Sequence, residues 1–528
     1  MPSLSITTRP GAGAQFSSAI GQIAHSRYAD AAICAALILL TAALLLPSFA
    51  SFPMDVWDES RNANNAIEMA ASGHWLVTTF NGVPDHWNTK PPLLIWMMAA
   101  LLRAGLPPLL AVRLPSIIAS MATVSVLFLF CRIVLRDRLA GVSAALLVLA
   151  SSLFMGRHVS FTGDYDALLT LLVLVSVLAF WRYVDAADTQ SVRWLAIAGT
   201  ALTLAMLTKG IAALIILPGL LVYLVMKQRL LWAARDPWLW LTGLTVLTIS
   251  TGYYMGRETL DPGYLQAVWE NELGGRYLAT LDAHRGGPIF YLSVLFLTFQ
   301  PGILLTPLVL RPLLGEASRR RDVVLITLLA AASLLIVITI AKTKYYWYAA
   351  PTVPLLSLAV GIALTDAFAS SRAAYVGSRV LVGPQVIKAA IFIGLGMTIA
   401  RGLYVQNFGS ADWASLPAQS QLWYGAFIES LHADGVAGNL LIIDGGVRND
   451  AGLKDYHPVA DFYRKYFDRN SSQSVAIVKP RSEVAAGARV LTCDPNIRPG
   501  LEADPRFTVV RSDPWCLFGQ MRVAGKPG

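Results

Sequence analysis

Residues 30–61 read DAAICAALILLTAALLLPSFASFPMDVWDESR, a long apolar run followed at once by three carboxylates. The run is long enough to cross a hydrocarbon core of about 30 Å. Asp55, Asp58 and Glu59 therefore lie where the chain leaves a predicted membrane span. Such acids either cap the next helix or belong to a site, where they can act as bases or metal ligands. Spacing alone leaves both interpretations open.

Composition indicates a membrane protein. Of its 528 residues, 55% are hydrophobic and 14% are charged, whereas a soluble domain carries about 25% charged residues. The formal charge of +9 does not indicate nucleic-acid binding, because Lys and Arg occur in short clusters between apolar runs. RDR at 136–138, KQR at 227–229 and RRR at 319–321 are typical of cytoplasmic loops. The sequence predicts a polytopic α-helical membrane protein.

The charge rule favours eleven spans, with the N-terminus inside and the C-terminus outside. This count requires the short helix predicted at 91–106 to lie on the membrane surface. It also requires 194–226 to be two short spans hinged at Lys209-Gly210. We expect a cytoplasmic tail (1–29), a transmembrane catalytic domain (30–405) with a large first extracytoplasmic loop (53–108), and an extracytoplasmic domain (406–528). The predicted spans are 30–52, 109–132, 139–156, 166–183, two within 194–226, 237–255, 288–310, 322–341, 348–368 and 385–403.

The segment 406–528 differs in composition from the rest. Short apolar or alternating runs (LLIID, SVAIV, RVLTC, FTVV, CLFGQMRV) are separated by turns, and HPVADFYRKYF has helical spacing. We predict a small soluble α/β domain. In an oxidising compartment, Cys493 and Cys516 would be a plausible disulfide pair.

The predicted topology brings polar residues to one side of the membrane. Asp58 and Glu59 share that side with the turn at 156–166, with Lys209 and with the stretch AKTKYYWY at 341–348. Taken singly, these groups also fit helix caps, snorkelling lysines and an interfacial aromatic belt. Together they suit a phosphate-bearing ligand and the deprotonation of a hydroxyl.

Several motifs resemble a known superfamily. MDVWDESRNANNAIEMAASGHWLVTTFNGVPDHWNTKPPLLIW is similar to the first loop of GT-C integral-membrane glycosyltransferases. It is most like the bacterial aminoarabinose transferases of lipid A, which are distantly similar to protein O-mannosyltransferases. Further similarities are R…DALLTLL at 157–172, LTKG…LP at 207–218, ENELGGRY…HRGGPIFYL at 270–292 and KYYWYAAPTVPL at 344–355. The resemblance covers about residues 50–360 and implies the GT-C fold.

The resemblance also implies roles for individual residues. Asp58 matches the catalytic carboxylate, Glu59 is its neighbour, and Asp166 matches a second acid better than Asp164 does. Cations around a lipid phosphate would be Lys90, Lys209, Arg276 and Lys344, and the further substrate-binding candidates are Arg61, Arg157, Tyr345 and Tyr348.

One departure from the family concerns metal binding. The aminoarabinose transferases carry Glu before the lysine of KPP, where this chain has Thr89. Dependence on a divalent metal is therefore in doubt, with Asp164 and Asp166 as the candidate ligands. No other cofactor is expected, because the sequence lacks a glycine-rich phosphate loop.

The expected reaction is transfer of a sugar from a polyprenyl phosphate to an envelope lipid or glycan, such as lipid A, outside a bacterial inner membrane. Asp58 would act as base, with inversion at the anomeric carbon as the expected outcome. The alternatives are a protein O-glycosyltransferase of the same fold and a lipid or solute transporter. No internal repeat of the kind found in transporters is visible.

Overall fold

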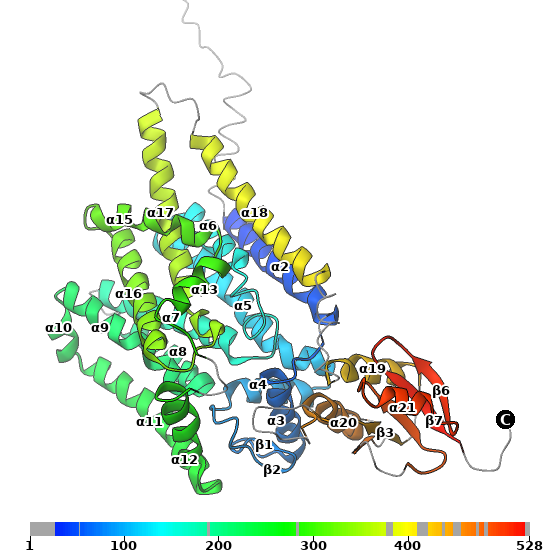
Figure 1. The fold of residues 1–528 in the computed structure, drawn as a ribbon. Coiled ribbons are helices and arrows are strands. Elements are labelled where there is room, and N and C mark those ends of the chain that lie inside the picture. The colour runs from blue at the N-terminus through cyan, green and yellow to red at the C-terminus, as the bar shows by residue number, and fades with distance from the viewer. Residues whose placement is uncertain are drawn as a thin grey trace, which may run out of the picture.

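Apolar helices build the larger part of the molecule, and a small α/β domain lies beside one end of them (Figure 1). The structure is a computed structural model. It describes residues 27–51, 53–186, 191–280, 285–375, 384–408, 421–435, 439–446, 456–470, 475–479 and 484–522.

Helices long and apolar enough to span a membrane number seven among the described residues, or eight if one sharply bent pair counts as a single span. The bent pair turns by 104° between Phe290–Thr298 and Gly302–Leu314. The helices of this part are α2 (Arg27–Ser51), α5 (Pro108–Val134), α6 (Arg138–Ala150), α7 (Tyr165–Asp185), α8 (Ser191–Lys209), η1 (Gly210–Ile216), α9 (Leu217–Met226), α10 (Leu230–Arg235), α11 (Pro237–Leu260), α12 (Tyr264–Val268), η2 (Trp269–Tyr277), α13 (Phe290–Thr298), α14 (Gly302–Leu305), η3 (Thr306–Val309), α15 (Leu310–Leu314), α16 (Arg319–Ile340), η4 (Tyr346–Ala349), α17 (Thr352–Tyr375) and α18 (Pro384–Phe408).

The segment Ser191–Met226 counts as one apolar stretch of 36 residues by length and composition. Its ion pairs show that it reverses direction. Lys209 pairs with Asp166 at the start of α7, whereas Lys227 pairs with Asp322 at the start of α16. That end of α16 lies at the far end of α7, because Arg319 pairs with Asp185. The reversal falls at Gly210, whose φ of +56° suits glycine, in agreement with two hinged halves.

The basic clusters gather at the end of the bundle away from Asp166. Arg138 pairs with Asp30, and Arg320 pairs with both Asp137 and Asp366. These partners come from α2, α16, α17 and the loop before α6. The predicted separation of basic clusters from the candidate site is therefore present in the fold.

The loop after α2 forms a small platform of its own. It contains α3 (Asp58–Ser72), the hairpin β1–β2 (Thr79–Phe80 and Val83–Pro84) and α4 (Leu93–Arg103). The hairpin turns at Asn81-Gly82, both with positive φ, as a tight two-residue turn requires. At eleven residues, α4 is too short to cross a bilayer, which takes about 20.

The C-terminal domain contains a five-stranded sheet in the order β4-β3-β5-β7-β6. β3 pairs in parallel with β4 and β5, and β7 pairs antiparallel with β5 and β6. A disulfide joins Cys493 to Cys516, the pairing proposed from the sequence. The elements are α19 (Gln421–Ala433), β3 (Leu440–Ile443), α20 (Pro458–Asn470), β4 (Val475–Val478), β5 (Arg489–Thr492), α21 (Arg498–Glu502), β6 (Phe507–Ser512) and β7 (Leu517–Met521).

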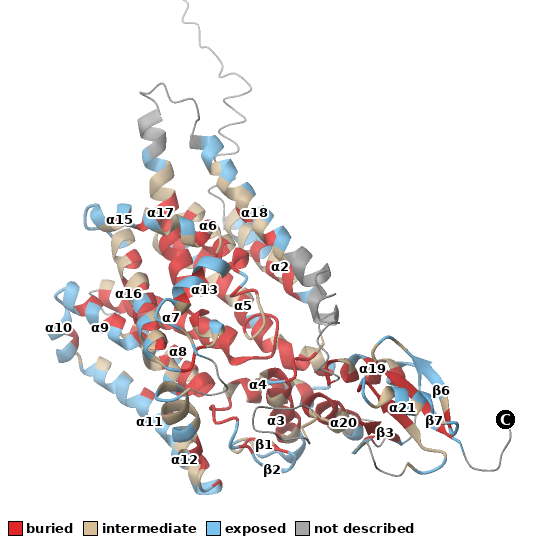
Figure 2. Cartoon of the chain, viewed as in Figure 1, coloured by how far each residue is buried: buried red, intermediate tan, exposed pale blue. Residues whose placement is uncertain are grey.

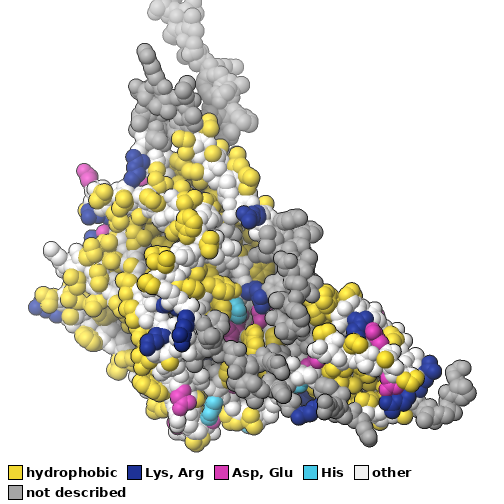
Figure 3. All heavy atoms as spheres, in the orientation of Figure 1, with side chains coloured by type: hydrophobic (Ala, Val, Ile, Leu, Met, Phe, Trp, Pro, Cys, Tyr) yellow, Lys and Arg dark blue, Asp and Glu magenta, His cyan; other side chains and the backbone are white. Residues whose placement is uncertain are grey.

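Buried and exposed residues are distributed differently in the helical part and the C-terminal domain. Figure 2 shows buried residues concentrated in α3, α5 and α7, and 83% of the apolar window of α7 is buried. Hydrophobic side chains cover the helical part in Figure 3, whereas charged groups gather at its edges and on the C-terminal domain. Exposed leucines of α11, such as Leu241, Leu244 and Leu247, belong to this apolar surface, which is the surface that a lipid environment requires.

Candidate active site

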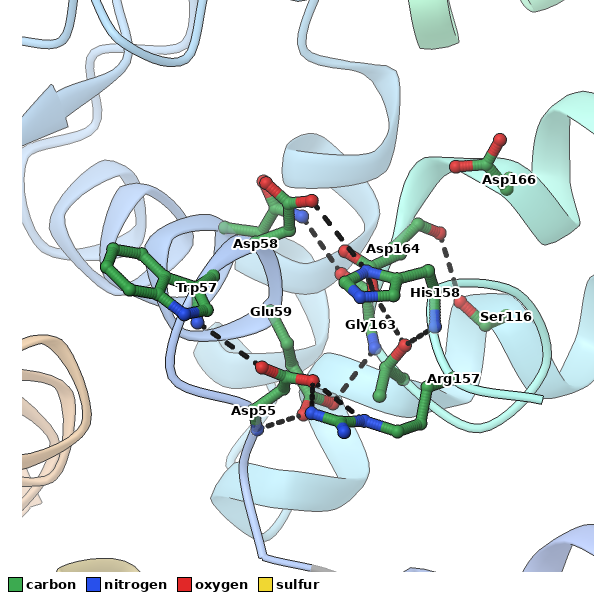
Figure 4. Close-up of polar contacts among 12 residues, drawn as sticks. Asp55, Trp57, Asp58, Glu59, Ser116, Arg157, His158, Gly163, Asp164 and Asp166 are labelled. Carbon is green, nitrogen blue, oxygen red and sulfur yellow. Dashed lines mark hydrogen bonds and ion pairs between the residues drawn. The ribbon is translucent and has the colours of Figure 1, made fainter. Parts of the chain in front are cut away.

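Asp58 lies at the first position of α3 and faces the turn between α6 and α7 (Figure 4). Nδ1 of His158 lies 3.7 Å from Oδ2 of Asp58 and 3.4 Å from Oδ2 of Asp164. The side chain of Asp58 is 32% exposed, against 4% for Asp164. We call these three residues the open cluster, because one of its carboxylates still faces solvent.

The turn that carries His158 is held tightly. His158 has a φ of +63°, and its backbone N–H donates to Oγ1 of Thr162 at 2.7 Å. Thr162 in turn donates to Asp164 at 2.5 Å. The imidazole stacks on Trp347 with the ring centres 3.8 Å apart. Sequence analysis did not single out His158, although it lies six residues before Asp164 in the same turn.

Two members of the open cluster, His158 and Asp164, have raised pKa values, for different reasons. Burial alone would lower the pKa of His158, but the carboxylates of Asp164, Asp58 and Asp55 raise it to about 9. Burial raises the pKa of Asp164 to about 6, against the opposing effect of His158. At neutral pH the imidazole therefore carries a positive charge between two acids.

Glu59, the neighbour of Asp58, is fully buried. Its carboxylate accepts two hydrogen bonds from Arg113, at 2.6 and 2.8 Å, and one each from the backbone N–H groups of Asp55 and Gly163. A carboxylate with four donors and no exposed face cannot reach a substrate. The prediction of a catalytic role for Glu59 is therefore corrected: it joins the first loop, α5 and the α6–α7 turn. Arg113, a cation within an apolar helix, was the sequence signal for this contact.

Two predicted substrate-binding arginines also have carboxylate partners. Arg157 binds Asp55 through Nε at 3.0 Å and through Nη2. Arg61 forms two hydrogen bonds of 2.7 Å with Asp85 and lies 3.7 Å from the ring centre of Phe80. These pairs fix the backbone around Asp58, and substrate binding by Arg61 and Arg157 stays a prediction. We call Asp55, Glu59, Arg113 and Arg157 the closed cluster.

Asp166 and Lys209 form a buried pair at the entrance of α7. Nζ of Lys209 lies 2.6 and 2.7 Å from the two oxygens of Asp166, and 5.0 Å from the ring centre of Tyr348. Lys209 lines two neighbouring, largely apolar pockets of about 310 and 300 Å³. Asp166 and Tyr348 line the first pocket, and Lys90 lines the second.

Glu272 of η2 was not predicted and contributes to both pockets. Its Oε1 lies 3.7 Å from Nζ of Lys90 and accepts a hydrogen bond of 3.3 Å from Thr89. A carboxylate from a distant loop thus lies beside the position where related enzymes carry Glu. The signal for it was the acidic run ENE at 270–272.

Lys344 is placed differently from the prediction. Its ammonium donates to the carbonyls of Thr339 and Ala341 at 2.6 and 2.8 Å, and burial lowers its pKa. It therefore caps the C-terminal end of α16, which corrects the prediction of phosphate binding. Tyr345 stacks on Trp347 at 4.6 Å and so supports the ring that covers His158. The side chain of Arg276 lies outside the described residues.

A divalent cation would be held by the open cluster, with His158 in its neutral form, rather than by Asp166. Ligand atoms of Asp58, His158 and Asp164 lie within 4.8 Å of one another. Nδ1 of His158 is buried and makes no hydrogen bond of normal geometry. Asp166 is held by Lys209, which corrects its candidacy as a ligand, whereas Asp164 keeps it.

Comparisons with known proteins agree with this architecture. Residues 89–254 match the family described as dolichyl-phosphate-mannose-protein mannosyltransferase. The structure of ArnT from Cupriavidus metallidurans bound to undecaprenyl phosphate aligns with a TM-score of 0.66, covering 95% of this chain and 100% of that one, at 17% sequence identity. The chain has the GT-C fold. The prediction of a polytopic membrane protein with this fold is thereby confirmed.

Curated relatives point in the same direction. An undecaprenyl phosphate-α-4-amino-4-deoxy-L-arabinose arabinosyl transferase of Shewanella sediminis is 28% identical over 266 residues, 49% of this chain and 47% of the relative. The enzyme of the same description from Pseudomonas savastanoi pv. phaseolicola is 26% identical over 378 residues, 70% of this chain and 67% of the relative. The chain thus spans about half to two thirds of these relatives' length.

Proposed function

We propose that the protein transfers a sugar from a polyprenyl-phosphate donor to a hydroxyl or phosphate group of an envelope lipid or glycan, with lipid A as the first acceptor to test. The observation that carries this proposal is the position of Asp58. It is a partly exposed carboxylate at the same end of the bundle as two apolar pockets lined by Lys90 and Lys209. The named relatives and the ArnT structure support it.

Asp58 is the best candidate for the general base. Glu59, Asp55 and Asp166 are each buried and bound by a cation, and Asp164 is almost fully buried. Asp58 would take the proton of the acceptor hydroxyl as that oxygen attacks the anomeric carbon of the donor.

The leaving group needs charge stabilisation and little else. As the new C–O bond forms, the bond between the anomeric carbon and the phosphate oxygen breaks, and the prenyl phosphate leaves with the electron pair. Lys90 and Lys209 can stabilise that charge where their pockets meet. The apolar walls of the pockets suit the prenyl chain of the donor.

A divalent cation bound by the open cluster would supply further positive charge near the reacting groups. We also propose that the site faces the periplasm of a bacterial inner membrane. This orientation rests on the basic clusters at the opposite end of the bundle, which are typical of a cytoplasmic face.

The test is reconstitution of the purified protein in vesicles with a radiolabelled undecaprenyl-phosphate sugar and purified lipid A. Wild type should transfer label to the acceptor, and Asp58→Asn should lower kcat by about 10²- to 10⁴-fold with an unchanged melting temperature. Thr343→Ser, a mild change in a wall of the first pocket, is a matched control. Activity that survives in Asp58→Asn would overturn the assignment of the base. Label that crosses the membrane without transfer would instead support a transporter.

A further inference from the structure

Trp57 lies directly before Asp58 and presents an open aromatic face. It is 37% exposed, in a loop whose neighbouring residues Met54, Asp55 and Val56 are each 2% exposed. In Figure 4 its indole points away from His158, to the other side of Asp58. The catalytic apparatus described above makes no use of this ring.

The C-terminal domain supports the indole from behind. The ring of Tyr456 stacks on Trp57, with centres 5.9 Å apart and planes at 22°. Tyr456 also lies 5.8 Å from Phe80 and from the guanidinium of Arg61. One face of Trp57 is therefore covered by a residue almost 400 positions away, while part of the ring remains exposed.

Tyr456 is anchored on both sides along the chain. The next residue, His457, lies 2.9 Å from Asp444 at the end of β3. The carbonyl of Pro458 accepts a hydrogen bond of 2.6 Å from the amide of Asn64 in α3. These contacts fix the tyrosine relative to the sheet of its own domain and to the helix that begins at Asp58.

A second set of contacts holds the domain against the first loop. Nζ of Lys465 lies 2.7 Å from Glu68 and donates to Asn64, also at 2.7 Å. Lys465 further lies 5.0 Å from the ring centre of Phe80. Burial raises the pKa of Glu68, but Lys465 outweighs this and holds it below its usual range. Two helices from distant parts of the chain, α3 and α20, thus form one rigid side of the site.

We propose that Trp57, supported by Tyr456, is the acceptor subsite, where the indole stacks on a sugar ring of the acceptor. This inference rests on the proposed function. An aromatic face is electron-rich and apolar, so it attracts the weakly positive C–H groups of a pyranose face. Ring stacking beside Asp58 would orient one acceptor hydroxyl toward the base. Asp166, which lines the first pocket, lies on the opposite side of Asp58 from Trp57 in Figure 4, so the two substrates would approach Asp58 from different sides.

The experiment measures separate KM values for lipid A, whose headgroup is an amino-sugar disaccharide, and for the undecaprenyl-phosphate sugar in reconstituted vesicles. Trp57→Ala and Tyr456→Ala should each raise the acceptor KM by about three- to tenfold. The donor KM and the slow hydrolysis of donor by water should not change. Trp57→Phe and Tyr456→Phe should restore most of the acceptor affinity, because each keeps a ring. Trp238→Ala removes a similarly exposed indole from α11 and serves as the control.

Two results would overturn the inference while leaving the proposed function intact. One is an unchanged acceptor KM in Trp57→Ala. The other is an equal rise in both KM values, which would indicate general damage to the site. Transfer to a serine-containing peptide but not to lipid A would overturn both the inference and the proposed class of acceptor, since no sugar ring would then be recognised. Failure of wild type to transfer sugar to any acceptor would instead overturn the proposed function.

Discussion

The open and closed clusters lie next to each other, and Asp58 and Glu59 are consecutive residues, yet their environments are opposite. In the closed cluster every carboxylate meets a guanidinium, as Glu59 meets Arg113 and Asp55 meets Arg157. In the open cluster two acids share one imidazole, and Asp58 keeps an exposed face. Charge balance stabilises the first cluster, whereas the second leaves a carboxylate available for chemistry.

The largest expected effect breaks the closed cluster. Glu59→Gln leaves Arg113 buried without its negative partner, which should cost about 3–5 kcal/mol of folding stability. Thermal unfolding in detergent should show a large drop in melting temperature, together with reduced yield. The matched change Asp58→Asn should alter stability by less than about 0.5 kcal/mol. Equal destabilisation by both substitutions would contradict the distinction between the clusters.

The pH dependence of stability tests the ion pair between Asp55 and Arg157 in the closed cluster. Burial would raise the pKa of Asp55, but Arg157 and His158 hold it below its usual value of 3.8. Because the pKa of Asp55 is lower in the folded state than in the unfolded state, ionised Asp55 stabilises the fold above pH 3.8. This stabilisation is lost as the pH falls through the pKa of Asp55 in the folded state. Asp55→Asn should therefore destabilise the protein by about 1–3 kcal/mol at pH 6 and by less at pH 3. Melting temperatures measured between these two values check this, and a constant difference would refute it.

The smallest expected effect compares two buried lysines outside the clusters. Lys209→Met should raise the donor KM about tenfold, because Lys209 lies where both pockets meet. Lys344→Met should leave the donor KM unchanged and lower only stability, since its ammonium caps α16. The single variant leaves the buried carboxylate of Asp166 without its cation. The double variant Asp166→Asn/Lys209→Met removes that carboxylate, so it separates the loss of donor binding from the loss of the ion pair. A tenfold rise in donor KM for Lys344→Met would restore the original prediction for that residue.

Predictions from the sequence were accurate wherever one physical pattern decided the outcome. Apolar length and basic clusters predicted the helical bundle and the separation of its two ends. Alternating runs predicted all five strands of the C-terminal sheet, and the two polar-segment cysteines form its disulfide. Motif resemblance singled out Asp58, Asp166 and Lys209. The fold places them at one end of the bundle, and their roles stay predictions.

Contacts were missed where a side chain's partner lies far away in sequence. Glu59 and Arg113 are 54 positions apart, and Arg157 and Asp55 are 102 positions apart. Nothing in local spacing distinguishes an arginine that binds phosphate from one that balances a buried acid. For the same reason, the hydrogen bond between Thr89 and Glu272, which are 183 positions apart, was not predicted.

The sequence by itself determined the membrane character, the fold class and the acid at the start of α3, because hydropathy, charge clusters and helix-start signals are local properties. Only the tertiary structure decided which of two neighbouring carboxylates remains open, and that Tyr456 of the C-terminal domain supports Trp57. Burial and pairing decide those outcomes. Both depend on which distant segments pack together, and the free energy of a buried charge is set by the neighbours that packing provides.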